Sequence, residues 1–186
     1  MTRPPIVILL SGWAGAGKDA AASLLADEMS FERLAFADVL KEDVSHATGL
    51  PLDLFHNHSL KDHPIVGSKT PRDLLLSHAA AARAVDPDIY IRKVAEYILD
   101  SSHKRFVISD WRYRRELAFL QNTLGEHARI VRGRIEREGI VPSDDPSEHD
   151  LDDACVEFTV ENNGGLSRFR DEIKAAVRYV LYDVAL

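Results

Sequence analysis

A glycine-rich stretch near the start of the chain constrains the fold more than any other feature. It reads G-W-A-G-A-G-K-D over residues 12–19, between an apolar run at 6–10 and a helix-forming run at 20–28. Glycine lets a backbone wrap closely around an anion, because it has no Cβ and adopts positive φ readily. The amide groups of such a loop, together with the positive end of the following helix, attract negative charge. This order of strand, glycine loop and helix predicts a phosphate-binding loop.

The last two residues of this stretch indicate what the loop would hold. The ammonium of Lys18 can contact the β- and γ-phosphates of a bound nucleotide. The next residue in such loops is usually Ser or Thr, which ligates Mg²⁺, but here it is Asp19. A carboxylate oxygen also suits Mg²⁺, and the start of a helix favours negative charge. The expected phosphate and magnesium contacts are Gly12, Ala14, Gly15, Ala16, Gly17, Lys18 and Asp19.

Short apolar segments alternate with helical ones along the rest of the chain. We expect further strands at 32–36, 106–109, 128–132 and 156–160. We expect helices at 38–48, 70–85, 89–99, 116–124 and 166–182, with an exposed loop at 51–68. This alternation indicates a five-stranded parallel sheet with helices on both faces and right-handed crossovers. The prediction is one three-layer α/β domain over residues 1–186, with an insertion at about 38–100 and a lid at about 133–153.

Ligands of open α/β sheets bind beyond the carboxyl ends of the strands, so the residues there are candidates for a site. Asp38 and Lys41 follow the second expected strand, although Asp38 is also placed to cap a helix. Asp110 follows the third, where phosphate-loop enzymes place a carboxylate that manages Mg²⁺. The alternative role of Asp110 is to cap the next turn. Arg112 lies beside it and is a candidate phosphate ligand.

Several other arginines lie at positions where an anionic ligand would account for their positive charge. Arg72 lies in the first turn of a helix, against the preference of the helix dipole. Arg83 lies near a helix end, where a cation is favourable without any ligand. Arg132, Arg134 and Arg137 precede a polar segment containing glycine and proline. This segment suits a lid that closes over a transferring phosphoryl group, and its alternative is a solvated loop.

Charge and composition make some functions less favoured than others. The chain has 23 Lys and Arg against 30 Asp and Glu, a net charge of −7, which disfavours nucleic acid as a partner without excluding a local basic cleft. The single cysteine, Cys155, cannot form an intramolecular disulfide, and we expect it in the core of a strand. His56, His58 and His63 match no zinc pattern.

No apolar run reaches the length of a membrane span. The first strand begins too early for a signal peptide, so we expect a cytoplasmic protein.

Taken in order, these segments resemble the deoxynucleoside monophosphate kinases carried by bacteriophages. The resemblance rests on the glycine loop with Asp19 after its lysine and on four weaker motifs. The first three are F-A-D-x-x-K at 36–41, P-R-D-L-L at 71–75 followed by Arg83 and D-P-D-I-Y at 86–90, and I-S-D-x-R at 108–112 with Glu116. The fourth is Arg132 followed by P-S-E at 146–148, ahead of E-N-N-G at 161–164. The alanines at 79–82 and Tyr90 depart from the family pattern.

This resemblance implies a P-loop kinase fold and transfer of phosphate from ATP, with Mg²⁺, to a deoxynucleoside monophosphate. It implies Lys18, Asp110, Arg112 and Arg132 as catalytic residues, with Asp19 and Asp110 on Mg²⁺. The expected acceptor-binding residues are Asp38, Lys41, Arg72, Arg83, Arg112 and Glu116. The lid would contribute Arg134, Arg137, Ser147 and Glu148. The adenine would be bound by Asn162, Asn163 and Gly164. The resemblance also suggests a homodimer. The alternatives are a kinase acting on 5-hydroxymethyluracil in DNA or on a small phosphorylated metabolite, and a non-catalytic nucleotide-binding module.

Overall fold

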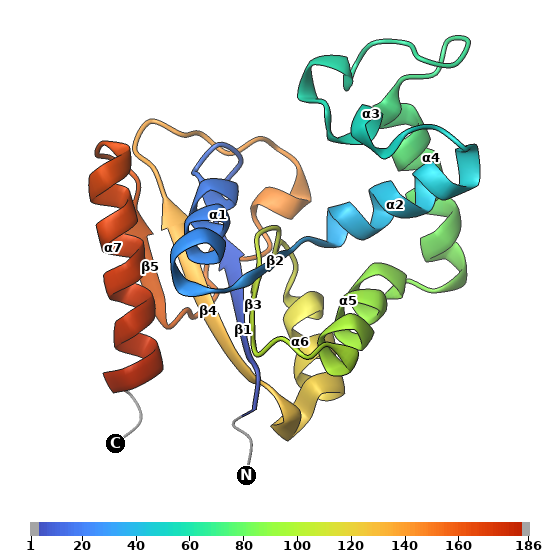
Figure 1. The fold of residues 1–186 in the computed structure, drawn as a ribbon. Helices are drawn as coiled ribbons and strands as arrows, with labels where there is room; N and C mark the ends of the chain where they lie inside the picture. Colours follow the sequence, from blue (N-terminus) through green and yellow to red (C-terminus); the bar gives the residue numbers. More distant parts are fainter. Residues whose placement is uncertain (1–3, 184–186) are drawn as a thin grey trace. The chain divides into compact units, whose positions relative to one another are not determined.

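The structure is a computed structural model that describes residues 4–183 (Figure 1). The chain forms two compact units. One consists of the chain up to Leu34 and from Ala95 onward, and the other is Ala35–Val94. Among the described residues, no helix is both long and apolar enough to cross a membrane.

The first unit is built on a five-stranded sheet in which every pair of neighbours is parallel, in the order β2-β3-β1-β4-β5. Its strands are β1 (Ile6–Ser11), β2 (Glu32–Leu34), β3 (Arg105–Ile108), β4 (Arg129–Glu136) and β5 (Phe158–Glu161). The central strand β1 is buried almost throughout, as its unbroken apolar run predicts. The parallel five-stranded sheet is confirmed.

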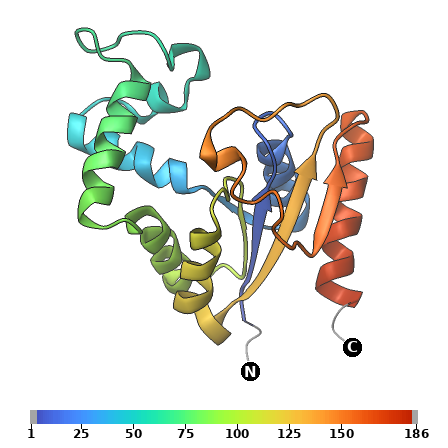
Figure 2. The same cartoon turned by 180° about the vertical axis from the view of Figure 1, so that it is seen from behind.

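Helices cover both faces of this sheet (Figures 1 and 2). They are α1 (Lys18–Met29) and α7 (Leu166–Arg178) on one face and α6 (Arg114–Leu124) on the other. Leu25 of α1 and Phe169 and Ile173 of α7 pack with Ile8 and Leu10 of β1 in one buried cluster. The short helices η2 (Gly125–His127) and η3 (Pro146–Glu148) and the π-helix η4 (Tyr179–Asp183) complete this unit, and α5 (Ile89–Asp100) runs from the second unit into it.

The second unit is helical, with α2 (Phe36–Thr48), α3 (Leu52–His56), the short helix η1 (His58–Leu60) and α4 (Pro71–Val85). The start of α4 matches its sequence signals closely. Thr70 and Asp73 form a reciprocal capping box, and Pro71 occupies the first turn. The helix expected from Thr70 is therefore confirmed.

Three expectations about boundaries are wrong. β2 ends at Leu34 and α2 begins at Phe36, so that Asp38 lies in the first turn of the helix and does not cap it. The expected loop at 51–68 contains α3, which buries Phe55. β4 continues to Glu136, because Gly133 and Ile135 face the core while Arg134 alternates with them. Residues 133–136 are therefore strand, and the segment leading to β5 begins at Arg137.

Cys155 is also not where the sequence predicts it. It is exposed and precedes β5, which begins only at Phe158. The apolar neighbours Val156 and Phe158 suggest a longer strand, but only residues 158–161 pair with β4. The cysteine therefore does not pack in the core.

Candidate active site

The loop after β1 has the backbone that its glycines predict. Gly12, Gly15 and Gly17 all have positive φ, of 134°, 82° and 109°. A Cβ on Gly12 would lie 2.2 Å from the carbonyl oxygen of Ile135, and one on Gly17 would lie 2.4 Å from Nδ2 of Asn162. The backbone angle favours glycine at both positions, and at position 12 the neighbouring backbone also leaves no room for a side chain.

Lys18 is buried at the start of α1, and its ammonium lies under the loop. Nζ donates hydrogen bonds to the carbonyl oxygens of Gly12, at 2.6 Å, and Trp13, at 3.0 Å. Burial lowers the pKa of Lys18 and the Arg112 guanidinium lowers it further, whereas carboxylates of Glu148, Asp19 and Asp110 oppose this shift. The loop thus encloses a cation with other charged groups close by.

Two carboxylates lie near this cation, Asp19 in the first turn of α1 and Asp110 shortly after β3. Oδ1 of Asp19 accepts hydrogen bonds from Oγ of Ser109 and from Arg33, both at 2.9 Å. Partial desolvation raises the pKa of Asp19, but these two hydrogen bonds outweigh it and hold the pKa below its ordinary value. Asp110 directly follows Ser109 and acts electrostatically on Lys18. The sequence did not indicate the part that Ser109 and Arg33 play here.

These oxygens are of the type that Mg²⁺ prefers. Among residues 4–183, no group of three or more His, Cys, Asp or Glu side chains is placed to hold a metal ion. Asp19 and Asp110 would therefore supply only part of a magnesium shell. Phosphate oxygens and water would supply the rest, as is usual for this ion.

Glu148 joins the segment between β4 and β5 to the glycine loop. Its Oε2 accepts a 2.7 Å hydrogen bond from the backbone N–H of Ala14, and its Oε1 accepts one of 3.0 Å from Arg112. Arg112 also donates to Oγ of Ser147 at 3.2 Å. The Glu148 side chain is only 5% exposed. Arg112, predicted to bind phosphate, and the lid residues Ser147 and Glu148 are thus brought together at the loop.

A second contact of the same segment involves Trp13, which the sequence did not single out. Trp13 Nε1 donates to Oδ1 of Asp152 at 3.3 Å. Oδ2 of Asp152 lies 3.0 Å from Nδ1 of His149, and Nε2 of His149 lies 2.9 Å from the carbonyl oxygen of Ser143. The hydrogen bond to Asp152 raises the pKa of His149, and the Ser143 carbonyl adds to this effect.

Arg132 and Arg134 lie on β4, and both guanidinium groups are paired. Arg132 pairs with Glu157, which lies just before β5, through its Nε and Nη2 atoms. Desolvation raises the pKa of Glu157, but the hydrogen bonds from Arg132 reverse the shift and lower it. Arg134 donates to the carbonyl oxygen of Leu151 at 2.8 Å and lies 3.2 Å from Glu136. Glu157 was not predicted.

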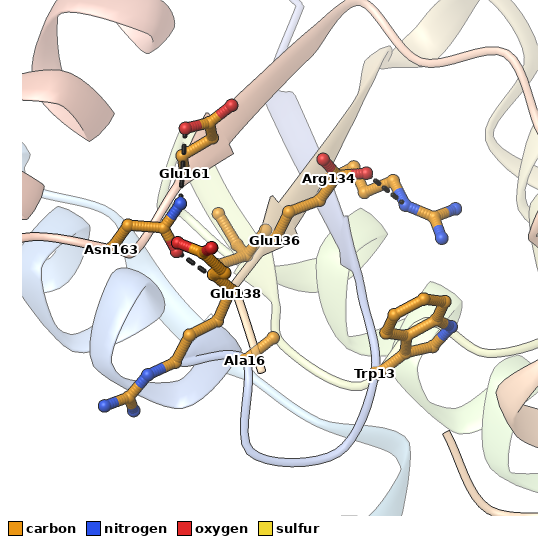
Figure 3. A pocket seen from close by; sticks show the side chains of 9 residues that line it. Trp13, Ala16, Arg134, Glu136, Glu138, Glu161 and Asn163 are labelled. Atoms are coloured by element: carbon orange, nitrogen blue, oxygen red, sulfur yellow. Dashed lines mark hydrogen bonds and ion pairs between the residues drawn. The ribbon is translucent and has the colours of Figure 1, made fainter. Parts of the chain in front are cut away.

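A cavity of about 270 Å³ opens beside the loop (Figure 3). The ends of β4 and β5 form one side of it and the glycine loop the other. Its lining residues are Trp13, Ala16, Arg134, Ile135, Glu136, Arg137, Glu138, Glu161 and Asn163. Asn163 Oδ1 accepts from the backbone N–H of Glu138 at 2.7 Å, and Asn162 Nδ2 donates to the carbonyl oxygen of Ala16 at 2.9 Å. Asn162 and Asn163 therefore connect the end of β5 to the glycine loop and to the segment just after β4, with Gly164 next along the chain.

Glu116 has a backbone role in this unit. Its Oε2 accepts hydrogen bonds from the backbone N–H groups of Arg112, at 2.8 Å, and Tyr113, at 3.0 Å. The side chain is buried at the start of α6, where unpaired N–H groups need acceptors. It holds the turn that carries Arg112.

The remaining acceptor candidates lie in the second unit. Lys41 donates to Asp38 at 2.6 Å and lies 3.4 Å from Nδ1 of His56. Arg72 pairs with Asp62 at 2.7 Å, and the Arg83 guanidinium lies 5.4 Å from the centre of the Tyr90 ring. Asp38 and Lys41 are adjacent, whereas Arg72 and Arg83 each have a different partner.

Comparison with solved structures shows which proteins share this fold. No protein-family model matches the chain, and no curated protein matches it in sequence. Among solved structures it is similar to a gluconokinase from Sinorhizobium meliloti 1021, with 14% identity, full coverage of both chains and a TM-score of 0.54. It is also similar to the shikimate kinase of Aquifex aeolicus vf5, with 14% identity, 95% of this chain and 98% of that chain covered, and a TM-score of 0.51.

A third similar structure contains ligands. It is the APS kinase of Mycobacterium tuberculosis in complex with AMPPNP and APS, with 10% identity, 95% of this chain and 99% of that chain covered, and a TM-score of 0.50. At such identities the likeness defines the fold. The chain has the three-layer fold of P-loop kinases.

Proposed function

We propose that this protein transfers the γ-phosphoryl group of ATP to a deoxynucleoside monophosphate, giving ADP and a deoxynucleoside diphosphate. The observation that carries the proposal is the loop of positive-φ glycines around the buried Lys18, at the end of the central strand of a kinase fold. The AMPPNP-containing APS kinase of the same fold supports ATP as the donor. The motifs at 36–41, 71–75 and 108–112 support a nucleoside monophosphate as the acceptor.

Nucleotide binding would begin at the loop. The backbone N–H groups of residues 12–17 and the ammonium of Lys18 would hold the triphosphate, since they combine fixed dipoles with a cation. The 270 Å³ cavity beside Ala16 would take the adenosine, with Asn163 and the acidic groups of Glu136 and Glu161 as hydrogen-bonding groups. Mg²⁺, held by Asp19 and Asp110, would neutralise phosphate charge.

Catalysis of this kind needs positioning and charge, and no covalent protein intermediate. Lys18 and Arg112 would stabilise the charge that develops on the transferring phosphoryl oxygens. Arg132, Arg134 and Arg137 would add positive charge from β4 and the lid. The acceptor's phosphate would be bound by Lys41, Arg72 and Arg83, with Asp38 orienting Lys41. In this scheme Glu116 acts by fixing the turn of Arg112.

An acceptor panel tests this proposal. Purified protein with Mg²⁺ and ATP is offered each deoxynucleoside monophosphate, a duplex containing 5-hydroxymethyluracil, phosphomevalonate, gluconate or shikimate, and ADP release is measured. We expect turnover with at least one deoxynucleoside monophosphate and none in its absence. Turnover with the duplex or a metabolite alone would transfer the proposal to that acceptor. ATP binding without turnover on any acceptor would favour the non-catalytic module.

A further inference from the structure

The glycine loop already holds an anion that belongs to the protein itself. The Glu148 carboxylate lies 2.7 Å from the Ala14 amide nitrogen and 3.0 Å from Nη1 of Arg112. A carboxylate in this position presents two oxygens to the same kinds of donor that bind a phosphate, namely a loop amide and a guanidinium. Its 5% exposure shows that solvent hardly reaches it.

The Lys18 ammonium, the other positive group of the loop, also has hydrogen-bond partners within the protein. Lys18 directs its Nζ to the carbonyl oxygens of Gly12 and Trp13. The Arg112 guanidinium lies close enough to Lys18 to lower the pKa of its ammonium, and the Glu148 carboxylate opposes this effect. A buried cation such as Lys18 is costly without a negative charge nearby, and the Glu148 carboxylate supplies one in this state.

We infer that Glu148 is an internal competitor of the nucleotide, occupying the phosphate-binding loop through the Ala14 amide and releasing Arg112 only when a phosphate displaces it. This inference rests on the proposed function, because it assigns regulation to the same loop. Nucleotide arrival and the freeing of Arg112 are then one event. The segment carrying Glu148 moves away from the loop as the triphosphate binds. Hydrolysis of ATP without an acceptor is limited, because the charge of Arg112 is neutralised by Glu148 until then.

The geometry explains why one residue suffices for this coupling. Glu148 lies in η3, between Asp145, whose Oδ1 accepts from the Ser147 N–H at 2.8 Å, and His149, which is tied to Asp152. The segment is therefore locally ordered, and it contacts the loop at Ala14 and Trp13. A competitor held in place by its own segment acts at a high effective concentration.

The test measures binding of inorganic tripolyphosphate by calorimetry to wild type, Glu148→Gln and Asp144→Asn. Glutamine keeps the shape of the side chain but removes its charge. Asp144 lies on the same segment and is exposed, so its variant controls for the loss of one negative charge. We expect Glu148→Gln to bind about tenfold more tightly, because the competent state no longer competes with an internal anion. Asp144→Asn should change the affinity less than twofold.

Equal or weaker binding by Glu148→Gln would overturn the inference, because the residue would then support anion binding or be irrelevant to it. Hydrogen exchange of the Ala14 amide gives a second readout, expected to be faster in Glu148→Gln than in wild type. Should that variant not fold, Glu148→Asp retracts the carboxylate and should also bind more tightly than wild type. If no acceptor is phosphorylated while Glu148→Gln still binds tripolyphosphate more tightly, the proposed reaction fails and the inference stands.

Discussion

The carboxylate of Glu148 accepts a hydrogen bond from the backbone N–H of Ala14, although the two residues are 134 positions apart in the chain. This contact joins the segment between β4 and β5 to the glycine loop after β1. It also brings Arg112, from the end of β3, to the same carboxylate. The segments that follow β1, β3 and β4 therefore meet at one charged group, which is where phosphate chemistry is proposed.

Removal of the Lys18 ammonium should abolish most turnover. Lys18→Ala is expected to lower kcat/KM by about 10²–10³-fold, since it deletes the buried cation of the proposed phosphate site. Lys174→Ala is the matched control, because Lys174 lies on α7 and pairs with Glu28 away from the loop. Steady-state kinetics of both variants check the prediction. A Lys18→Ala enzyme as active as the Lys174→Ala enzyme would remove Lys18 from the mechanism.

A side chain at Gly12 should destabilise the fold itself. Gly12→Ala places a Cβ against the carbonyl oxygen of Ile135 at a residue with φ of 134°. We expect the free energy of unfolding to fall by about 2–5 kcal/mol, from backbone strain together with the collision. Gly139→Ala separates the two effects, because Gly139 has φ of 78° but open space around it, and should cost about 1 kcal/mol. Urea unfolding measures both, and similar costs would contradict this account.

The pairing of Arg132 with Glu157 gives a prediction that separates structure from catalysis. A double-mutant cycle of Arg132→Ala and Glu157→Ala should give a coupling energy of about 0.5–1 kcal/mol, because both side chains are partly exposed. If Arg132 also acts on the phosphoryl group, Arg132→Ala should lower kcat well below the value for Glu157→Ala. Equal values of kcat in the two single variants would leave Arg132 with a structural role alone.

His149 should titrate above its ordinary pKa of 6.5, because both ring nitrogens face acceptors, Asp152 and the Ser143 carbonyl. A raised pKa means that the contact stabilises the segment fully below pH 6.5 and is lost as pH rises through the folded pKa. NMR titration of the imidazole measures this value. Asp152→Asn should lower it, and the Trp13 side chain, which donates to Asp152, should become more mobile as pH rises. A pKa at or below 6.5 would contradict the arrangement.

The sequence predicts best what neighbouring residues determine. The apolar run of β1, the glycine loop and the capping box at Thr70 and Asp73 all form through contacts within a few residues, and all are found. The length of β4 was missed because Arg134 and Glu136 look like loop residues. Their polarity is tolerated since they alternate with Gly133 and Ile135, which face the core.

Contacts between distant residues explain what the sequence could not provide at the site. Glu148 could be named as a residue of the lid, but its position on the Ala14 amide depends on how the segment after β4 folds back. Arg132 was expected to reach a phosphate, yet the register of β4 with β5 places Glu157 beside it. Residue type gave the chemistry of each candidate, and only the fold gave its partner.

The most direct test of the central claim is a crystal structure with magnesium and AMPPNP. We expect the β- and γ-phosphates to accept hydrogen bonds from the Ala14 amide and its neighbours in the loop, with Lys18 turned from the carbonyl oxygens of Gly12 and Trp13 to the phosphates. Glu148 should have left the loop, and the adenine should lie in the cavity beside Ala16. A triphosphate bound elsewhere, with Glu148 still on the Ala14 amide, would contradict the account.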